Sequence, residues 1–514
     1  KELLPKEILK ELSLPKLTNA LIYLHNPPEG SDLVALENGK TPSQLRLSFE
    51  ELLAHYMSLR QLRIHAKKEN AIPLNKPSVH LEKLIQELPY SLTLAQNRVI
   101  KEIDQDVKKD SPMMRLIQGD VGSGKTVVAA ASAAIAISNN VQIALMAPTE
   151  LLAEQHFKQF EAWFHNPKIK VTWLSGSQKA NERSKSLDNI VSGKANIIIG
   201  THALFQESVK FNNLGLIIID EQHRFGVHQR LALRNKGSKG LHPHQLVMTA
   251  TPIPRTLAMA AYADLDTSII DELPPGRQSI ITIALPQERR SEVIQRLYDA
   301  SKKGRQAYWV CPLIEESETL NYQAAEESYK TLSEKLKNLK IGLIHGRMKM
   351  NERNKIMTNF KNGYIDVLVA TTVIEVGVDV PNATLMIIEN AERMGLSQLH
   401  QLRGRVGRGE NQSHCVLLYK KPLGEIAKNR LSALRKSNDG FFLAQRDLEL
   451  RGPGELLGTR QTGLPEYRIA NLVRDSHLIP KVQKTAITIQ NKHSKIEIEI
   501  ANRWLGNAHN YGKV

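Results

Sequence analysis

Short runs of apolar, mostly β-branched residues alternate with helical patterns twice along this chain of 514 residues. Runs that are apolar throughout are typical of parallel strands, because helices cover both faces of such a sheet. A linker of Leu273-Pro274-Pro275-Gly276 separates the two series. The sequence therefore predicts an α/β fold with two tandem parallel-sheet domains. The predicted strands are residues 141–146, 197–200, 216–219 and 246–249 in the first domain, and 307–311, 341–344, 367–370, 385–388 and 415–418 in the second.

The two ends of the chain have a different character. Residues 49–66 repeat apolar side chains close to every 3.6 positions, which predicts one amphipathic helix. After about residue 436 the sequence becomes polar and rich in Arg and Gly. We expect four parts: a helical N-terminal segment over residues 1–76, sheet domains over 77–275 and 276–435, and a smaller C-terminal unit over 436–514.

The charge balance is strongly basic, with 69 Lys and Arg against 53 Asp and Glu and a net charge of +16. This surplus favours a polyanionic partner, either nucleic acid or an anionic membrane surface, although a merely basic protein is also compatible with it. Residues 126–149 carry no charge and could span a bilayer by length alone. Asn139-Asn140 predicts a turn there, so we expect a buried helix followed by a buried strand. The two cysteines include no CxxC pair, so neither a disulfide framework nor a cysteine-based zinc site is expected.

Residues 119–126, GDVGSGKT, fit the phosphate-binding pattern G-x-x-x-x-G-K-[ST] in full. Glycines let consecutive backbone N–H groups surround phosphate oxygens, and the N-terminus of the following helix adds positive potential. We expect Lys125 to reach the β- and γ-phosphates and the Thr126 hydroxyl to bind Mg²⁺. The predicted nucleotide-binding residues are Gly119, Gly122, Ser123, Gly124, Lys125 and Thr126. The alternative is a glycine-rich turn without a ligand.

A predicted buried strand runs directly into Asp220-Glu221. This position puts both carboxylates at the carboxyl edge of a parallel sheet, where ligands of such sheets bind. Asp220 would hold the Mg²⁺ shell, and Glu221 would orient or deprotonate the attacking water. Two acids after a strand are common, but about 95 residues after a phosphate-binding loop they are the expected second half of a nucleotide site.

Hydrolysis of a triphosphate also needs positive charge near the departing phosphoryl group. Arg405 and Arg408, in the segment QLRGRVGRG at residues 401–409, could supply it from the second sheet domain. Arginine suits this role because its planar fork binds phosphate oxygens in a bidentate manner and stays charged. An arginine supplied across a cleft acts only when two lobes close, which would couple the chemistry to motion. A solvated basic face is the alternative.

The order and spacing of these segments resemble the motor of superfamily-two helicases, which implies two RecA-like domains. The match extends over roughly residues 85–420 and consists of YSLTLAQ at 90–96, the phosphate-binding loop, APTELL at 147–152, GTHA at 200–203, DEQH at 220–223, TATP at 249–252, HGRM at 345–348, ATTVIEVGVD at 370–379 and QLRGRVGRG. The resemblance implies that Gln96 reads adenine and that Gly377 and Asp379 belong to the nucleotide site. It also implies contacts to DNA phosphates, made by Thr149, Thr201, Thr371 and Thr372.

Finer features resemble the RecG family of branched-DNA translocases. IPRTLAM at residues 253–259 and DELPPGR at 271–277 carry this likeness within the motor. DLELRGPGE at 447–455 and GTRQTG at 458–463 resemble a translocation motif that the family shares with the transcription-repair coupling factor. The resemblance implies that Arg451, Arg460 and Gln461 belong to a helical-hairpin lever acting on duplex DNA. Ordinary salt bridging is the alternative for the two arginines.

Taken together, the family resemblance implies an ATP-dependent DNA helicase with 3′–5′ polarity that uses ATP and Mg²⁺, reverses replication forks and migrates Holliday junctions in recombination and repair. Its implied partners are forked, junction or duplex DNA, with single-strand DNA-binding protein as a further candidate and no membrane. A monomer in the bacterial cytoplasm, associated with the nucleoid, is expected. Alternatives are a coupling-factor type of duplex translocase, an RNA helicase, and a nucleic-acid-binding module with an inactive ATP site.

The sequence begins Lys1-Glu2-Leu3 without an initiator Met, so we expect a fragment. By comparison with the family pattern, an N-terminal wedge domain that splits branch points is not recognisable in it. We therefore expect this chain to hydrolyse ATP but to unwind forks poorly.

Overall fold

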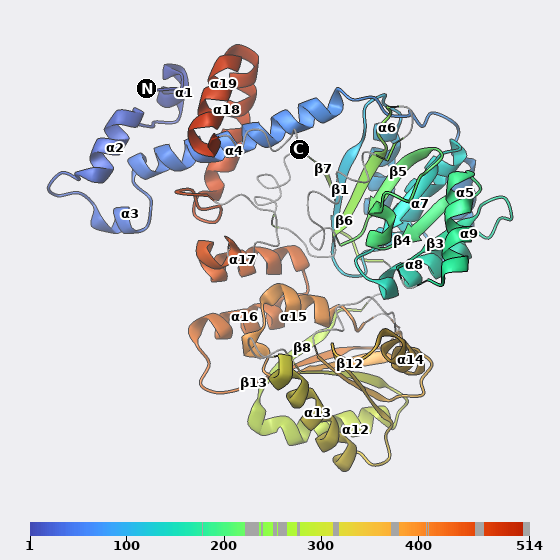
Figure 1. Cartoon of the computed structure of the whole chain (residues 1–514). Coiled ribbons are helices and arrows are strands. Elements are labelled where there is room, and N and C mark those ends of the chain that lie inside the picture. Colours follow the sequence, from blue (N-terminus) through green and yellow to red (C-terminus); the bar gives the residue numbers. More distant parts are fainter. Residues whose placement is uncertain are drawn as a thin grey trace. The chain divides into compact units, whose positions relative to one another are not determined.

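The computed structural model describes the whole chain except residues 177, 222–235, 238–239, 250–253, 255–264, 275–277, 312–317, 372–379, 408, 410, 458–466 and 507–514. It divides into two compact units (Figure 1). The first unit comprises residues Lys1–Asn70, Ile253–Asp266 and Arg451–Val514, and the second comprises Ala71–Pro252 and Thr267–Leu450. The second unit contains both parallel sheets apart from Asp266.

The first sheet has seven strands in the order β3-β4-β2-β5-β6-β1-β7. Their bounds are β1 Met114–Gly119, β2 Gln142–Met146, β3 Val171–Leu174, β4 Ile197–Gly200, β5 Leu214–Ile219, β6 His244–Thr249 and β7 Asp266–Ile270. Every residue of β2, β4, β5 and β6 is buried, as expected for central parallel strands covered on both faces. The helices of this domain are α5 Val79–Glu87, α6 Leu94–Val107, α7 Lys125–Ser138, α8 Glu150–Trp163 and α9 Ala180–Val191.

The second sheet has six strands in the order β10-β11-β9-β12-β13-β8. Their bounds are β8 Ile281–Pro286, β9 Gln306–Val310, β10 Ile341–Ile344, β11 Val367–Ala370, β12 Ala383–Ile388 and β13 His414–Tyr419. Its helices are α12 Arg290–Ser301, α13 Glu318–Lys335, α14 Met350–Lys361, α15 Leu396–Arg403 and α16 Glu425–Lys436, and α17 Gly440–Leu457 follows. Separate apolar clusters pack on its two faces, one containing Tyr308 and the other Trp309.

These two sheets confirm the predicted pair of parallel-sheet domains. Each of the nine predicted strands coincides with an observed strand to within two residues at either end. The uncharged stretch over residues 126–149 forms most of α7, a turn in which Asn140 has φ 60°, and β2. Among the described helices, none has the length and apolar character needed to cross a membrane. The prediction of a buried helix followed by a buried strand was therefore correct.

The two sheets repeat one topology. Pairing the strands in chain order, β1 with β8 through β6 with β13, reproduces the same neighbours in both sheets. Even a buried glutamine recurs at the start of the second strand of each set. Gln142 donates to the carbonyls of Ile190 and Ala195, and Gln306 donates to those of Phe360 and Ile365. Positions in one sheet can therefore be compared directly with positions in the other.

The first unit is helical. Its N-terminal helices are α1 Lys6–Glu11, α2 Leu17–His25, α3 Leu33–Glu37 and α4 Pro42–Lys67, and its C-terminal helices are α18 Ile479–Lys492 and α19 Ser494–Leu505. The helix predicted over residues 49–66 is the larger part of α4. The two ends of the chain share one apolar core, which contains Phe49 and Leu53 of α4 together with residues of α18 and α19. Helix α4 lies beside α18 and α19 (Figure 1). Buried Glu51 reinforces this by accepting the backbone N–H groups of residues 468–470 at 2.5–2.9 Å.

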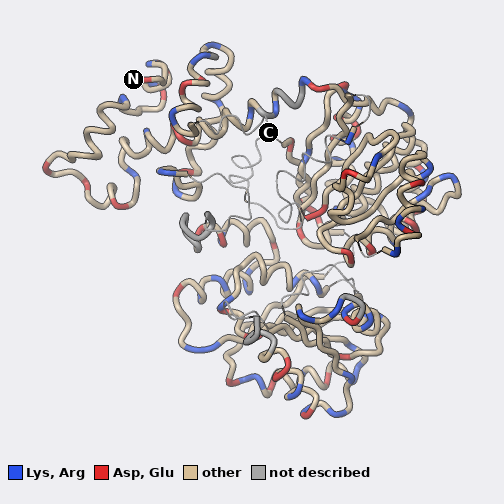
Figure 2. Tube along the Cα trace, viewed as in Figure 1, with Lys and Arg blue, Asp and Glu red and all other residues tan. Residues whose placement is uncertain are grey.

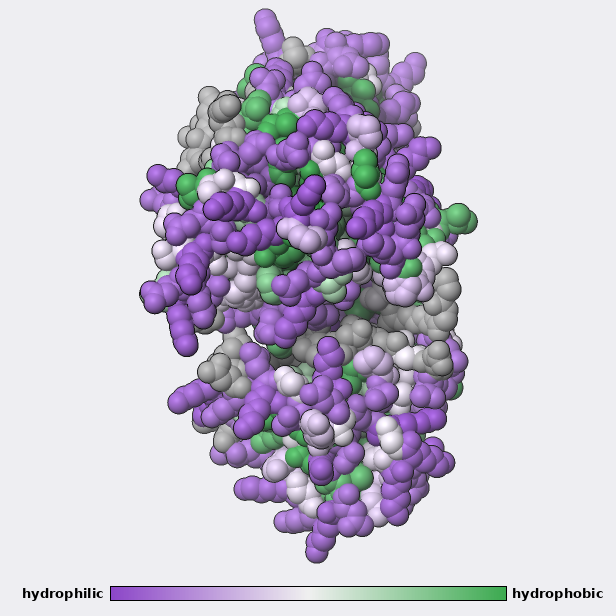
Figure 3. All heavy atoms as spheres, turned by 90° about the vertical axis from the view of Figure 1, so that its right-hand side faces the viewer, coloured by the Kyte–Doolittle hydropathy of each residue, from purple (hydrophilic) through white to green (hydrophobic). Residues whose placement is uncertain are grey.

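The basic surplus is spread over the molecule rather than confined to one segment. Lys and Arg occur along both units and around both sheets (Figure 2). The face shown in Figure 3 is covered mainly by hydrophilic side chains, and its apolar residues form small separate areas. Outside the atoms drawn in grey, this face therefore offers no broad apolar area for contact with a partner.

Candidate functional site

The phosphate-binding loop, residues 119–126, connects β1 to α7. Gly122 and Gly124 have φ angles of 77° and 82°, a left-handed conformation that residues with a side chain rarely adopt. Lys125 is only 8% exposed, and its ammonium group donates to the carbonyls of Gly119 and Asp120 at 2.8 Å each. The Ser123 hydroxyl is buried and has no hydrogen-bond partner among the described residues. The loop thus presents a buried cation and an unpaired hydroxyl, which suits a phosphate.

Gln96 lies directly against this loop. Thr93 and Gln96 form a capping box at the N-terminus of α6, in which the Gln96 side chain accepts the N–H of Thr93 at 2.9 Å. The side-chain amide then donates to the carbonyl of Ser123 at 2.9 Å. Gln96 is buried and held at both ends, so the structure places this residue, which the family resemblance implies for the nucleotide site, against the phosphate-binding loop.

Asp220 follows β5 at the carboxyl edge of the first sheet, as expected. One carboxylate oxygen lies 2.7 Å from Nε2 of His156 on α8, and the other accepts the N–H of Glu221 at 3.0 Å. Burial alone would raise the pKa of Asp220, but the hydrogen bond and charge of His156 and the charge of Lys125 lower it overall. Asp220 is therefore an ionised carboxylate, the form that binds a divalent cation.

Glu221 adopts φ 53°, an uncommon conformation for a residue with a long side chain. Such backbone geometry is often found where a turn directs a catalytic side chain. Within the described part of the chain, no group of three or more His, Cys, Asp or Glu could hold a metal ion by itself. Mg²⁺ binds through one or two carboxylates together with substrate phosphates, so Asp220 and the Thr126 hydroxyl fit it only as part of a nucleotide complex.

Two of the predicted DNA-contacting threonines follow equivalent strands. Thr201 comes directly after β4 and Thr371 directly after β11. Both residues are buried, at 2% and 3% exposure, and both hydroxyls have no hydrogen-bond partner among the described residues. Thr149 differs, because its hydroxyl caps α8 by accepting the N–H of Leu152 at 3.4 Å.

The arginine segment follows α15 and approaches the phosphate-binding loop within the second unit. A Cβ added to Gly404 would lie 2.8 Å from Cβ of Val121, so these two backbones are close. Arg403 is 2% exposed and donates to the carbonyls of Leu434 and Ser437 at 2.7 and 2.8 Å, which makes it part of the packing. Arg405 is partly buried next to Gly404.

Several predicted site residues lie outside the described part of the chain. These are Thr372, Gly377, Asp379, Arg408, Arg460 and Gln461, and the side chain of Arg451. Sequence reasoning missed His156, which has no local motif and is defined only by the packing of α8 against the edge where β5 ends. It also missed Asp120 and His400, which contact each other and are considered further below.

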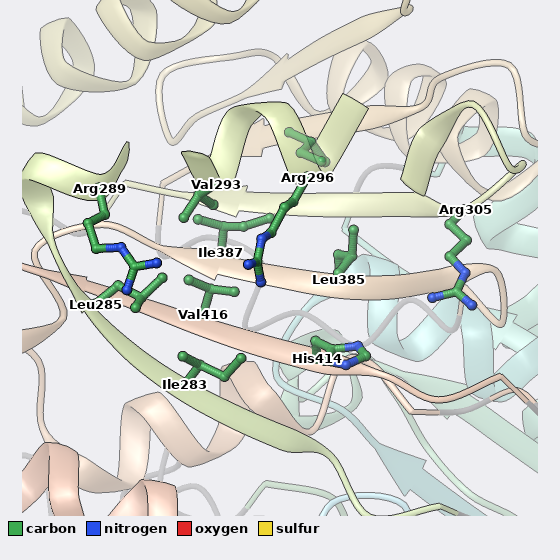
Figure 4. A pocket seen from close by; sticks show the side chains of 11 residues that line it. Ile283, Leu285, Arg289, Val293, Arg296, Arg305, Leu385, Ile387, His414 and Val416 are labelled. Carbon is green, nitrogen blue, oxygen red and sulfur yellow. The ribbon is translucent and has the colours of Figure 1, made fainter. Parts of the chain in front are cut away.

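A separate cavity of about 340 Å³ lies between α12 and the second sheet (Figure 4). Apolar side chains of β8, β12 and β13 form its floor, and Arg289, Arg296 and Arg305 line it. None of its lining residues belongs to the motifs identified in the sequence. This cavity is therefore separate from the predicted nucleotide site.

Three family models match consecutive parts of the chain. The model of the DEAD/DEAH box helicase matches residues 93–260, and that of the helicase conserved C-terminal domain matches residues 285–410. The model described as ATP-dependent DNA helicase RecG, domain 3, C-terminal, matches residues 437–505. The residues that form the candidate site fall within the first two matches.

Curated relatives match nearly the whole chain. ATP-dependent DNA helicase RecG of Haemophilus influenzae is 56% identical over 96% of this chain and 72% of its own length. The protein of the same name from Escherichia coli K12 is 57% identical over 99% of this chain and 74% of its own. A solved structure of RecG bound to a three-way DNA junction is 41% identical with a TM-score of 0.75, over 93% of this chain and 62% of that one. Saccharomyces cerevisiae Dbp5, at 15% identity and a TM-score of 0.54, supports the fold alone.

Proposed function

Because this chain belongs to the ATP-dependent DNA helicase RecG family, we propose that it is an ATP-driven translocase that acts on branched DNA. The observation that carries the proposal is the buried ammonium of Lys125 in a glycine-rich loop, electrostatically linked to the ionised carboxylate of Asp220. The strongest matches favour this family over the coupling-factor class. The DNA junction in the solved relative supports branched DNA as the substrate.

ATP binds with its phosphates in the loop between β1 and α7. Lys125 releases the loop carbonyls and pairs with the β- and γ-phosphates, while Ser123 gains the hydrogen-bond partner that its hydroxyl lacks. Gln96, fixed beside Ser123, recognises the adenine. Mg²⁺, held by Thr126 and Asp220, supplies charge neutralisation at the phosphates. Gly377 and Asp379 complete the nucleotide site from the second sheet domain.

Glu221 orients and deprotonates the water that attacks the γ-phosphorus. The ionised state of Asp220 matters here, because His156 keeps that carboxylate charged and fixes its direction. Arg405 and Arg408 stabilise the negative charge that develops on the transferred phosphoryl group. Since they come from the other sheet domain, hydrolysis requires that the two domains approach each other, and product release lets them separate.

DNA contacts are mainly to phosphates, because a translocase must tolerate any sequence. Thr201 and Thr371 are suited to this role, since a buried hydroxyl without a partner costs about 1–3 kcal/mol that a phosphate oxygen could recover. Thr149 and Thr372 complete the set. Arg451, Arg460 and Gln461 form the lever that converts domain closure into movement along duplex DNA.

These functions are distributed over the four parts expected from the sequence, residues 1–76, 77–275, 276–435 and 436–514. We further propose 3′–5′ movement by a monomer in the bacterial cytoplasm, associated with the nucleoid, and single-strand DNA-binding protein as a partner. This chain hydrolyses ATP on forked DNA.

The deciding experiment is ATP hydrolysis with and without forked DNA. We expect forked DNA to stimulate the wild-type chain, and Glu221→Gln to lower hydrolysis at least about 100-fold, the size typical of losing a catalytic base, while ATP still binds. Glu154→Gln, on the half-exposed side of α8, is the matched control and should behave as wild type. An unstimulated wild type, or full activity in Glu221→Gln, would reject the proposal.

A further inference from the structure

Asp120, the second residue of the phosphate-binding loop, points its carboxylate away from the loop toward α15 and α17. One oxygen accepts the N–H of Val121 at 2.8 Å and also contacts Nε2 of His400. The other accepts the N–H of Gly440, the first residue of α17, at 3.1 Å. All four residues belong to the second unit. A residue of the nucleotide loop is thus bonded to two helices that follow the second sheet.

The protonation of His400 can be assigned from its neighbours. Nδ1 lies 2.9 Å from a guanidinium nitrogen of Arg403, and arginine can only donate. Nδ1 therefore accepts, and in the neutral ring the proton lies on Nε2, which donates to Asp120. Burial alone would raise the pKa of Asp120, but the hydrogen bonds from His400 and from the N–H of Val121, together with the charge of Lys125, lower it overall. The link is therefore a charge-assisted hydrogen bond, the stronger class of such bonds.

These contacts close a ring. Arg403 donates to the carbonyl of Ser437, which lies in the short segment between α16 and α17, and the N–H of Gly440, the first residue of α17, donates to Asp120. Further along α17, the Asp447 carboxylate accepts the hydroxyl of Ser397 at 2.8 Å at the start of α15. Helix α15 is therefore hydrogen-bonded to α17 at its N-terminal end through Ser397 and Asp447, and linked to it at its C-terminal end through Asp120.

The backbone of Asp120 also contacts Lys125, the predicted phosphate-binding residue of the loop. Its backbone carbonyl accepts the ammonium group of Lys125, together with the carbonyl of Gly119. A phosphate that draws Lys125 toward itself weakens these bonds and frees the Asp120 peptide group. The same residue therefore responds to the nucleotide through its backbone and holds α15 and α17 through its side chain.

We propose that Asp120 is a positioning residue that couples occupancy of the phosphate-binding loop to the position of α17. The inference rests on the proposed motor function and adds a route from ATP to the helix that precedes the translocation sequence at residues 458–463. Asp120 contacts neither the reacting phosphate nor DNA in this scheme. Without the Asp120 side-chain contacts, the chain should still hydrolyse ATP but should move less far along DNA for each ATP hydrolysed.

The test measures base pairs travelled per ATP hydrolysed, from displacement of a third strand bound to duplex DNA. Gly440→Pro removes the N–H that Asp120 accepts and adds a ring at a buried position, and proline is tolerated at the first position of a helix. We expect this ratio to fall about tenfold, in line with losing a hydrogen bond to a charged group. ATP affinity and hydrolysis without DNA should stay at the wild-type level.

Gly424→Pro is the matched control, because Gly424 precedes α16 with φ −63° and no atom lies within 4 Å of a Cβ built there. It should keep the wild-type ratio. Asp120→Asn provides a second variant of similar shape. Its side chain has only one oxygen, so its NH₂ group must lie against either the N–H of His400 or the N–H of Gly440, and one of the two hydrogen bonds is lost. We expect it to lower the ratio as well, and it decides the matter if Gly440→Pro does not fold.

The outcomes separate this inference from the proposed function. If the wild-type chain hydrolyses no ATP on DNA, the motor function itself fails. If the wild type moves and both variants keep its ratio, Asp120 has no coupling role and the inference is wrong. Equal losses of ATP affinity and movement in Gly440→Pro would also overturn it, because the contact would then only maintain the fold.

Discussion

Gly124 and Gln96 provide a direct energetic test of the nucleotide site. Gly124 precedes α7 with φ 82°, and a Cβ built there would lie 2.2 Å from the side-chain nitrogen of Gln96. That nitrogen donates to the carbonyl of Ser123. Gly124→Ala should therefore cost roughly 1–2 kcal/mol for the left-handed backbone. It should cost a further ~1–3 kcal/mol because Gln96 must move and leave a buried carbonyl unpaired.

The two contributions can be separated by a matched glycine and a double-mutant cycle. Gly363 has φ 78° and no atom within 4 Å of its built Cβ, so Gly363→Ala should show the backbone cost alone. In a Gln96→Ala background the obstructing amide is gone, and Gly124→Ala should also fall to about 1–2 kcal/mol. The predicted coupling between the two positions is therefore about 1–3 kcal/mol.

Hydrogen exchange measures each cost in the domain that carries it, with peptides from α6 and α7 for positions 96 and 124 and peptides from α14 for position 363. A loss of ~1.4 kcal/mol appears as a tenfold faster exchange of protected amides. The readout does not depend on ATP, so a role of Gln96 in adenine binding does not confuse it. Additive effects of the two substitutions, within about 0.5 kcal/mol, would mean that Gln96 is not packed against Gly124 and would refute the reasoning.

Two further predictions concern stability. Burial, with the charge of Arg468, lowers the pKa of His55 to about 4 from the usual 6.5. The unfolded chain therefore binds this proton more readily, and the helical unit should lose up to ~3 kcal/mol as pH falls from 6.5 toward 4. Thermal unfolding of His55→Gln should lack this pH dependence. Arg290→Ala leaves Glu389 buried without its ion pair at 2.7 Å and should destabilise the second domain by about 3–5 kcal/mol, measured by urea unfolding. The double variant Arg290→Ala/Glu389→Gln should recover much of this loss, because it no longer buries an unpaired charge.

The strands could be predicted from the sequence where both of their faces are buried. Central strands such as β4 and β5 consist of apolar residues alone, so composition identifies them. The edge strand β3 has alternating buried and half-exposed residues over only four positions, VTWL, and gives no such signal. β8, an edge strand of the second sheet, is half-exposed over most of its length and was not predicted, whereas the edge strand β10, IGLI, has only apolar side chains and was predicted.

The site was predictable where its chemistry lies in a continuous segment. The phosphate-binding loop and the acids after β5 are local, and Gln96 came from a family pattern. The partners of these residues were not predictable in this way. His156 reaches Asp220 across 64 positions and His400 reaches Asp120 across 280, so both contacts depend on which helix packs beside which strand end.

Because the two sheets have the same topology, residues at equivalent positions can be compared to find which features occur in both sheets and which in only one. Lys125 and Arg290 are each the first residue of the helix that follows the first strand of their set. In the second sheet this cation is already paired with Glu389, which stands where Asp220 stands in the first. The cation of the second sheet is therefore bound to a carboxylate, whereas Lys125 in the first sheet donates to two backbone carbonyls.

Thr201 and Thr371, in contrast, occupy equivalent positions, and neither hydroxyl has a hydrogen-bond partner in the part of the chain that the structure describes. A group retained in both halves fits a task that both perform, which in a translocase is holding DNA. We therefore expect Thr201→Val and Thr371→Val to weaken binding of duplex DNA to a similar extent, by about three- to tenfold each for one lost hydrogen bond. ATP affinity without DNA should be unchanged in both. Binding measured by fluorescence anisotropy would refute this if either valine variant kept wild-type affinity for DNA, because one sheet would then hold the duplex alone.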